Sequence, residues 1–387
     1  MTGQLPREIF TALQTRQPEI EKLIRALVEA ESPSGDEEGS KAVVDLLVAA
    51  AGQLDCVNGI DRANVPGFGQ HVIIRAFQKE DNAQQIVLVG HTDTVHARGS
   101  LGERPWRRAA GRIYGPGIFD MKANCALALE VLRALSELKA TPAFGVTLAL
   151  TCDEEVGSQS GWPWLQQIVD PQHTRCAFVL EPPALGGRVK TSRKGTGIFM
   201  IKVEGKAAHA GLEPEKGASA ILELARQTEQ LHAINLSGSG ITLNVGVVHG
   251  GTRSNVVAAE AEGEIDVRFS TEAESVEIER ILLNRKPVDE RTKVFVSGGI
   301  NRPPMERTTA VVELFEKARA VAAELDFELG EAQVGGASDG NFLAAMGIPV
   351  LDGLGISGDG AHAVHEHIEA DDIARRGALI GGLLMKC

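Results

Sequence analysis

The alternation of short apolar runs with helical segments constrains the fold of this chain more than any other feature. Runs that suit buried strands occur at 86–89, 146–150, 178–180 and 348–351. Apolar residues recur at helical spacing over 19–31, 36–54, 125–138, 309–325 and 373–385. This βαβ rhythm is typical of an α/β domain whose mixed, mostly parallel sheet is flanked by helices.

The middle of the chain has a different order of elements. Strands are expected at 197–203, 241–248, 259–269 and 293–296, and helices at 219–231 and 272–283. Taken in order they give βαββαβ, which is typical of a ferredoxin-like α+β domain. The simplest arrangement is an inserted domain over 197–303 within a larger domain formed by 1–196 and 304–387.

Composition excludes several kinds of partner. Lys plus Arg is 39 and Asp plus Glu is 52, and the resulting net charge of −13 argues against nucleic acid. No apolar run approaches the roughly 18 residues of a membrane helix, so we expect no membrane partner. Five cysteines without a CxxC pair suit reduced thiols, and the opening MTGQLPREIF lacks the features of a signal peptide. Both observations favour a cytoplasmic location.

Polar side chains follow each of the expected strands. They are His91 and Asp93, Asp120 in a glycine-rich loop, Glu154 and Glu155, Glu181, and His362. In open α/β sheets the strand ends line one crevice, so we expect these groups to meet. Two imidazoles and three carboxylates, from His91, Asp120, Glu155, Glu181 and His362, could hold two divalent ions, and zinc favours such ligands. Glu154 would be free to accept a proton, and Asp93 could orient His91.

Two other hypotheses fit parts of the same sequence. The segment 336–340 matches GxSxG with Ser338 as nucleophile. With Asp352 or Asp359 and with His362 it gives the order Ser, Asp, His of a serine hydrolase, but it leaves the other strand-end groups unexplained. The second alternative is a binding or scaffold protein without catalysis, which metal content and amidase turnover would test.

The motifs taken together resemble a known enzyme family. They lie at 91–95, 114–120, 153–158, 181–182, 205–211 and 361–366. This combination resembles the di-zinc exopeptidases and amidohydrolases, a family that includes glutamate carboxypeptidase, aminoacylase, acetylornithine deacetylase and succinyl-diaminopimelate desuccinylase. The resemblance implies a zinc-exopeptidase-like catalytic domain, and a lid and dimerisation role for the inserted domain.

The resemblance also implies a role for each strand-end residue. His91 and Glu181 would bind one metal, Glu155 and His362 the other, Asp120 would bridge them, Glu154 would be the general base and Asp93 the partner of His91. The metals would be two zinc ions, with cobalt or manganese as alternatives. A cis peptide bond is expected after Asp120. The neighbours His365 and His367 have no matching role, and His96 is expected to be a loop residue.

Within that family, the local sequence around these motifs looks most like that of the glutamate carboxypeptidases of the carboxypeptidase G type. This implies cleavage before a C-terminal amino acid, glutamate above all, in N-acyl amino acids, folates or small peptides; an N-acyl amino acid deacylase is the alternative. The implied substrate-binding residues are Arg302, Asn255, Arg268, Gly336 and Lys190. Arg302 suits this role because a guanidinium grips a carboxylate through two hydrogen bonds. His209 would reach the site of the neighbouring subunit in a homodimer and steady an oxyanion there.

Overall fold

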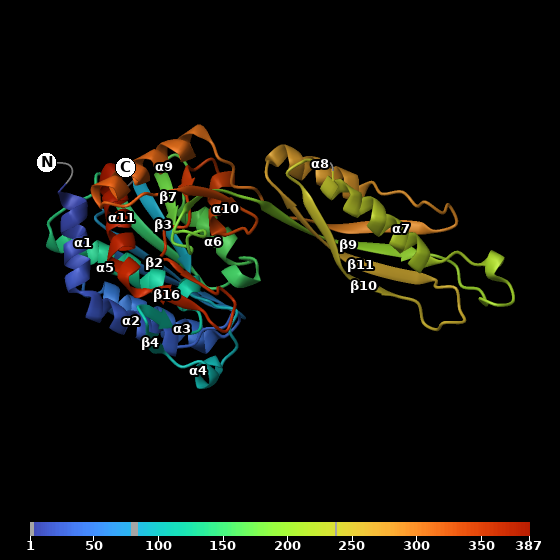
Figure 1. The fold of residues 1–387 in the computed structure, drawn as a ribbon, viewed down its shortest axis with the longest axis horizontal. Helices are drawn as coiled ribbons and strands as arrows, with labels where there is room; N and C mark the ends of the chain where they lie inside the picture. The colour runs from blue at the N-terminus through green and yellow to red at the C-terminus, as the bar shows by residue number, and fades with distance from the viewer. Residues whose placement is uncertain (1–3, 79–83, 237) are drawn as a thin grey trace. The chain divides into compact units, whose positions relative to one another are not determined.

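The computed structural model describes residues 4–78, 84–236 and 238–387, and the chain forms two compact units (Figure 1). The large unit comprises Met1–Thr191, Arg307–Gln333 and Ser338–Cys387; the inserted unit comprises Ser192–Glu306 and Val334–Ala337. These bounds lie close to the expected 197 and 303, and the short segment at 334–337 is an addition to the inserted unit. The lid and dimerisation roles of the inserted unit stay predictions.

A six-stranded sheet forms the centre of the large unit. Its strands are β1 (Val57–Val65), β2 (Gly69–Ala76), β3 (Gln85–His91), β6 (Gly145–Thr151), β7 (Thr174–Val179) and β14 (Val350–Leu351). Their order is β1-β2-β6-β3-β7-β14, with parallel pairs from β6 to β14 and antiparallel pairs at β1–β2 and β2–β6. The expected mixed, mostly parallel sheet is confirmed, whereas the hairpin β1–β2 was not anticipated.

The described part of the large unit also contains helices. They are α1 (Leu5–Thr15), α2 (Gln17–Glu29), α3 (Glu37–Ala51), α4 (Ser100–Glu103), α5 (Ala123–Glu137), α6 (Gly161–Ile168), α9 (Thr309–Glu324), α10 (Asp339–Ala345) and α11 (Ile373–Lys386). Figure 1 shows α1, α2, α5 and α11 together on one side of the sheet. α1 and α11 pack closely because Gly377 has no side chain: a Cβ there would lie 2.4 Å from Cδ1 of Leu13.

The parallel strands bring the polar motifs to one edge of the sheet. His91 is the last residue of β3, Glu154 and Glu155 lie in a short turn after β6, and Glu181 follows β7. β3 pairs in parallel with both β6 and β7, so the three carboxyl ends lie side by side. Of the residues described, none belongs to a helix both long and apolar enough to span a membrane.

A smaller sheet connects two loops of the large unit that are far apart in sequence. Its strands are β4 (Arg107–Ala109), β5 (Arg112–Tyr114), β15 (Gly358–Asp359) and β16 (His367–Glu369), in the order β15-β16-β5-β4. It holds the segment around His362 against the segment before Asp120. Two further strands, β8 (Val189–Arg193) and β13 (Glu331–Val334), lie at junctions between the units along the chain.

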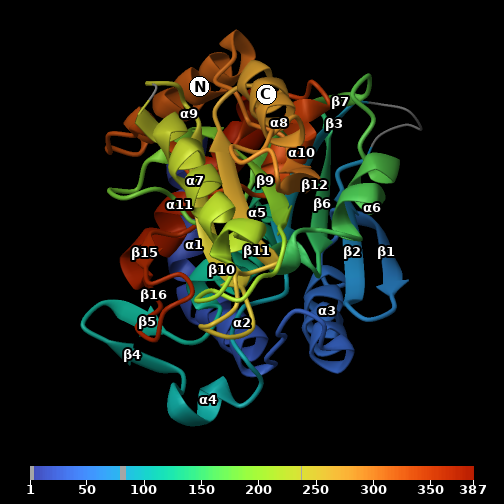
Figure 2. The same cartoon turned by 90° about the vertical axis from the view of Figure 1, so that its right-hand side faces the viewer.

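The inserted unit has the expected order of elements. These are β9 (Gly195–Glu204), α7 (Ala220–His232), β10 (Thr242–Gly250), β11 (Glu260–Phe269), α8 (Glu272–Leu283) and β12 (Lys293–Arg302). The sheet order β10-β11-β9-β12, with antiparallel pairs throughout, is that of a ferredoxin-like fold. Figure 2 shows α7 and α8 on one face of the sheet. Alternate residues of β9 and β11 are buried beneath them, including Phe199, Ile201 and Val267.

Candidate metal centre

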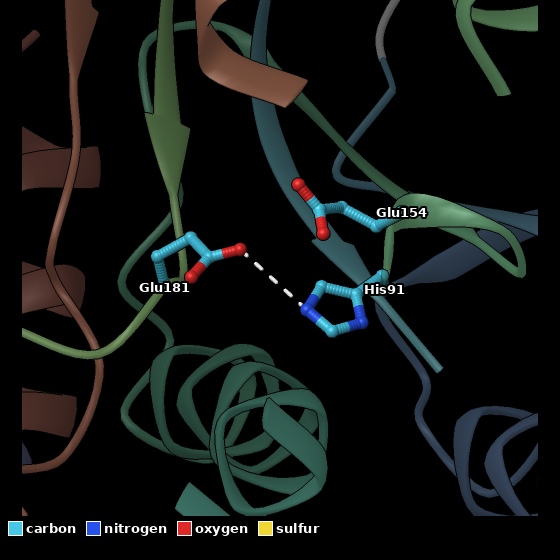
Figure 3. Close-up of side chains that lie close together, drawn as sticks. All are labelled: His91, Glu154 and Glu181. Carbon is cyan, nitrogen blue, oxygen red and sulfur yellow. Dashed lines mark ion pairs between the residues drawn. The ribbon is translucent and has the colours of Figure 1, made fainter. Parts of the chain in front are cut away.

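The imidazole of His91 lies at the centre of a group of carboxylates. The ring is buried, and its Nδ1 lies 3.0 Å from the carbonyl oxygen and 3.3 Å from Oδ1 of Asp93. Its Nε2 lies 3.2 Å from Oδ1 of Asp120 and 3.5 Å from Oε1 of Glu181. Figure 3 shows the ion pair with Glu181, with the carboxylate of Glu154 close to the same ring. Asp93 therefore orients the ring so that Nε2 points at the other acids.

A second imidazole completes the group. Nε2 of His362 lies 3.4 Å from Oδ2 of Asp120 and 3.1 Å from Oε2 of Glu155. Asp120 thus has one oxygen near each of two imidazoles, one at the end of β3 and the other in the loop between β15 and β16. This is the arrangement that a carboxylate needs in order to bridge two ions.

The backbone around Asp120 has two special features. The Asp120–Met121 peptide bond is cis, as the resemblance implied. Gly117, three residues earlier, has a φ of +70°, and a Cβ there would lie 2.4 Å from Cγ2 of Thr94. A side chain at position 117 would therefore meet both backbone strain and a clash, which explains the glycine in this loop.

Asp93 connects the two parts of the site. Besides its contact with His91, its carboxylate accepts hydrogen bonds from the backbone N–H groups of Glu154 (3.1 Å) and Glu155 (3.2 Å). The hydroxyl of Ser34 donates a further bond of 2.6 Å. Burial opposes ionisation, but the hydrogen bond with His91 and the other donors hold the pKa of Asp93 below its ordinary value. One carboxylate thus fixes the imidazole and the turn that carries both glutamates.

The carboxylates and imidazoles shift one another's titration. Burial alone would lower the pKa of His91, but its carboxylate neighbours, Asp120 first, raise that pKa well above its ordinary value. Hydrogen bonds with Asp120 and Glu155 raise the pKa of His362 to about 10. Burial opposes ionisation of Asp120, yet the hydrogen bonds from His362 and His91 lower its pKa. Burial raises the pKa of Glu155. The site therefore favours positive charge at its centre.

The donor set fits divalent cations. The carboxylates are those of Asp93, Asp120, Glu154, Glu155 and Glu181. They outnumber the two imidazoles, so the donor set is rich in the oxygen ligands that a divalent cation takes. Among the described residues Oε1 of Glu155 is buried without a hydrogen-bond partner, which is costly unless a cation takes that place. Nitrogen and carboxylate oxygen ligands of this kind suit zinc.

The carboxylate of Glu154 lies close to the proposed metal-ligand atoms. His91, Glu154 and Glu181 each offer a ligand atom, and these atoms lie within 4.8 Å of one another. The same holds for His91, Asp120 and Glu155. By position alone Glu154 could therefore contact a cation as well as accept a proton, and its predicted role as base needs a test.

The substrate-binding residues expected from the sequence fall in both units. Lys190 is buried on β8 of the large unit, and its backbone pairs with Asp352. In the inserted unit Arg302 is buried on β12 and Arg268 forms an ion pair of 2.8 Å with Asp266.

The remaining predicted residues of the inserted unit are exposed. His209 and Asn255 lie on adjacent segments, since the N–H of Ala210 donates to the carbonyl of Asn255 at 3.0 Å. Gly336 is exposed, and its carbonyl accepts a hydrogen bond of 3.0 Å from Arg193. The roles of all these residues stay predictions.

The serine-hydrolase alternative gains no support from the position of Ser338. Its side chain is buried, and its hydroxyl donates a 2.7 Å hydrogen bond to Asp352 while accepting one from the N–H of Gly340. It caps the first turn of α10. Since the imidazole of His362 is engaged with acids elsewhere, Ser338 has the contacts of a structural residue.

Three other histidines, His365, His367 and His96, were expected to lie outside the metal site. His365 is exposed, and His367 is buried with its Nδ1 bonded to the carbonyl of His365 at 2.9 Å, so neither joins the cluster. His96 lies in a loop, as expected, but it is buried, and its Nε2 lies 2.5 Å from Oε2 of Glu366. The two residues are 270 positions apart, and no local motif signals their contact.

Comparisons with known proteins agree with this arrangement. The family described as peptidase family M20/M25/M40 matches residues 87–386. The chain is 28% identical to carboxypeptidase G2 of Pseudomonas sp. (strain RS-16) over 388 residues, which covers 97% of this chain and 91% of that protein. It is 26% identical to succinyl-diaminopimelate desuccinylase of Thioalkalivibrio sulfidiphilus (strain HL-EbGR7) over 322 residues, covering 78% and 83%.

A solved structure shares the fold. Aminopeptidase PepT from Bacillus cereus ATCC 10987 superposes with a TM-score of 0.77 at 21% identity, covering 96% of this chain and 98% of that one. The family match spans most of the chain and includes the polar strand ends that form the cluster. The chain therefore belongs to peptidase family M20/M25/M40 and is a metal-dependent hydrolase of that family.

Proposed function

We propose that this hydrolase cleaves the amide bond before a C-terminal amino acid, with glutamate as the residue released. The observation that carries the chemistry is the position of Asp120, with one carboxylate oxygen near each of two imidazoles. The glutamate specificity is supported by the similarity to carboxypeptidase G2 along nearly the whole chain. N-acyl amino acids, folates and small peptides are the substrate class.

The proposed metal ligands divide between two divalent ions. His91 and Glu181 would hold one, Glu155 and His362 the other, and Asp120 both. When bound, two zinc ions, or cobalt or manganese in their place, would supply Lewis acidity that polarises the scissile carbonyl and acidifies an attacking water.

The protein's own groups then manage orientation and protons. Asp93 holds the imidazole of His91 with Nε2 toward the reacting centre. Glu154 accepts a proton from the attacking water at its carboxylate and passes it to the leaving amine nitrogen. Arg302 grips the free carboxylate of the released amino acid with its guanidinium, and Lys190, Asn255, Arg268 and Gly336 complete the contacts to the substrate.

A deacylase is the second candidate. Desuccinylases are among the relatives of this chain, and such an enzyme cleaves the same kind of bond but selects the acyl group. The two functions differ in which side of the amide bond determines the rate.

A substrate panel tests this directly. N-acyl amino acids are prepared with a constant acyl group and different C-terminal residues, and then with a constant glutamate and different acyl groups. The metal-loaded protein should prefer glutamate strongly and tolerate changes of acyl group. A preference set by the acyl group alone would instead support the deacylase. Chelation should abolish turnover and a fluorophosphonate should not; loss of activity with labelling of Ser338 would contradict the metal mechanism.

A further inference from the structure

A single buried carboxylate, that of Glu366, holds the backbone of the loop that carries Asp120. Oε1 of Glu366 accepts hydrogen bonds from the backbone N–H groups of Phe119 (2.9 Å) and Asp120 (3.0 Å). Oε2 accepts one from the N–H of Gly117 (2.8 Å). Three donors in four residues thus converge on one side chain, and this contact fixes the loop immediately before the cis peptide bond.

His96 supplies the fourth hydrogen bond to Glu366. Its Nε2 lies 2.5 Å from Oε2, and its Nδ1 lies 3.3 Å from Nη1 of Arg104. A guanidinium can only donate, so Nδ1 must be the acceptor and the ring proton must sit on Nε2. His96 therefore donates to Glu366 through Nε2.

These contacts join three loops of the large unit. His96 belongs to the loop after β3, Asp120 to the loop before α5, and Glu366 to the segment that carries His362. Glu366 lies four residues after His362 and also holds the backbone of Asp120. A displacement of Glu366 would therefore move both the Asp120 carboxylate and the imidazole of His362 that contacts it. Because Glu366 and Asp120 are 246 residues apart, the contact is a tertiary constraint.

We propose that Glu366 and His96 are positioning residues for the metal centre: Glu366 sets the Asp120 carboxylate between the imidazoles of His91 and His362, and His96 holds Glu366 in that position. The inference rests on the metal centre of the proposed function. Groups that orient metal ligands from outside typically change metal affinity by about 10–100-fold when they are removed.

Three substitutions of His96 separate its two hydrogen bonds. His96→Gln retains an N–H near the place of Nε2 and can still donate to Glu366. His96→Asn retains an acceptor near the place of Nδ1 and loses the donor. His96→Leu removes both groups. His365→Ala is the matched control, because His365 is exposed on the segment that carries Glu366.

Three measurements are made on each purified full-length variant. They are the zinc affinity, the absorption spectrum of the cobalt-loaded protein, and the hydrogen exchange of the Phe119 and Asp120 amides in metal-free protein. We expect about 10–100-fold weaker zinc binding and an altered cobalt spectrum for His96→Asn and His96→Leu. Their amides at 119 and 120 should exchange faster. His96→Gln should restore most of each property, and His365→Ala should match the wild type.

The comparison of two folded polar variants keeps the test decisive even if His96→Leu fails to fold. Equal zinc affinity, spectrum and amide exchange in His96→Gln and His96→Asn would overturn the positioning role. Failure of the wild type to bind any divalent metal would overturn the proposed function instead. In that case the amides still report on the loop, and unchanged exchange in His96→Asn would overturn the inference by itself.

Discussion

The two units of the chain present their predicted functional residues in opposite ways. In the large unit His91 and Asp93 are almost fully buried and contact one another and their neighbours. In the inserted unit His209 and Asn255 are exposed, and Nδ1 of His209 accepts a hydrogen bond of 3.1 Å from the backbone N–H of Gly211. A buried, mutually bonded set is pre-organised, whereas the role predicted for His209 requires a group outside its own unit.

The difference follows from the architecture of each unit. Parallel strands deliver their carboxyl ends to one edge, so residues from β3, β6 and β7 must meet there. The antiparallel sheet of the inserted unit has no such common edge, and its predicted residues are spread along β11, β12 and the segments between strands. The large unit therefore brings its predicted residues together into one chemical site. The roles predicted for the inserted unit, in substrate binding and dimerisation, depend on groups outside that unit.

Replacing the proposed base should have the largest effect. Glu154→Gln removes the proton acceptor but keeps the size of the side chain, so turnover should fall by about 10²–10⁴-fold, the usual contribution of a general base. The variant should still contain about two zinc ions per chain, measured by elemental analysis. Glu38→Gln, on an exposed position of α3, is the control.

Loss of metal from Glu154→Gln would contradict the assignment. Glu154 lies in one of the groups that could hold an ion, so a ligand role is the alternative that this measurement addresses. Glu154 and Glu155 would then have to exchange roles.

The second prediction is that His209, the exposed histidine of the inserted unit, acts in the site of another subunit. We propose a homodimer in which His209 steadies the oxyanion in the partner's site, and the loss of one such donor costs about 10²–10³-fold in rate. His209→Ala should show this loss, while His249→Ala, exposed at the end of β10, should not.

Mixing two inactive proteins tests the exchange of His209 between subunits. When His209→Ala and Glu154→Gln subunits exchange, a mixed dimer contains one site with both residues intact, so activity should partly return. Proven subunit exchange without recovered activity would refute the role in the partner's site.

The sequence predicted the cluster because each of its residues adjoins a regular element. Apolar runs located the strands, and residues that end or directly follow a parallel strand, such as His91 and Glu181, are positioned by that strand. The same periodicity predicted the βαββαβ order of the inserted unit, because its strands alternate buried and exposed residues.

What the sequence missed depends on contacts between distant segments. The hairpin β1–β2 has an edge strand whose residues are mostly half-buried or exposed, so it lacks a clear apolar run. Helix α1 was missed at the start of the chain. The contact of His96 with Glu366 joins residues 270 positions apart, and a single sequence contains no pattern that links them.

A third prediction concerns the scaffold of the large unit. Asp93→Asn replaces one carboxylate oxygen by an NH2 group, which cannot accept the hydrogen bond that this oxygen takes from the N–H of Glu154 or of Glu155. We expect zinc affinity to fall by about 10–100-fold, as for other groups that orient a metal ligand. Asp170→Asn is a matched control, because Asp170 is exposed and also pairs with a histidine, His173, at 2.7 Å. Equal affinity in both variants would show that Asp93 does not organise the site.

The last prediction concerns Glu223 of the inserted unit. Its replacement should leave turnover unchanged and destabilise the inserted unit alone. The buried carboxylate of Glu223 on α7 accepts hydrogen bonds from Gln227 (2.7 Å) and from the backbone of Val288 (2.8 Å) and Asp289 (2.9 Å). Burial opposes ionisation, but these donors lower the pKa of Glu223 below its ordinary value of 4.5. The stabilisation is therefore present above pH 4.5 and is lost as the pH falls through the lowered pKa.

Glu223→Gln should destabilise the inserted unit by about 1.5–3 kcal/mol at pH 7, the contribution of a hydrogen bond to a charged group. The difference from wild type should shrink as the pH falls below 4.5, where the carboxyl of the unfolded chain takes up its proton, and disappear once the native carboxyl is protonated at its lowered pKa. All three tryptophans, Trp106, Trp162 and Trp164, belong to the large unit, so their fluorescence reports its unfolding, and hydrogen exchange over 220–232 reports that of the inserted unit. Exchange should accelerate in Glu223→Gln and not in the exposed control Glu229→Gln, with the fluorescence transition unmoved. A shift of both signals together would mean that the two units unfold as one.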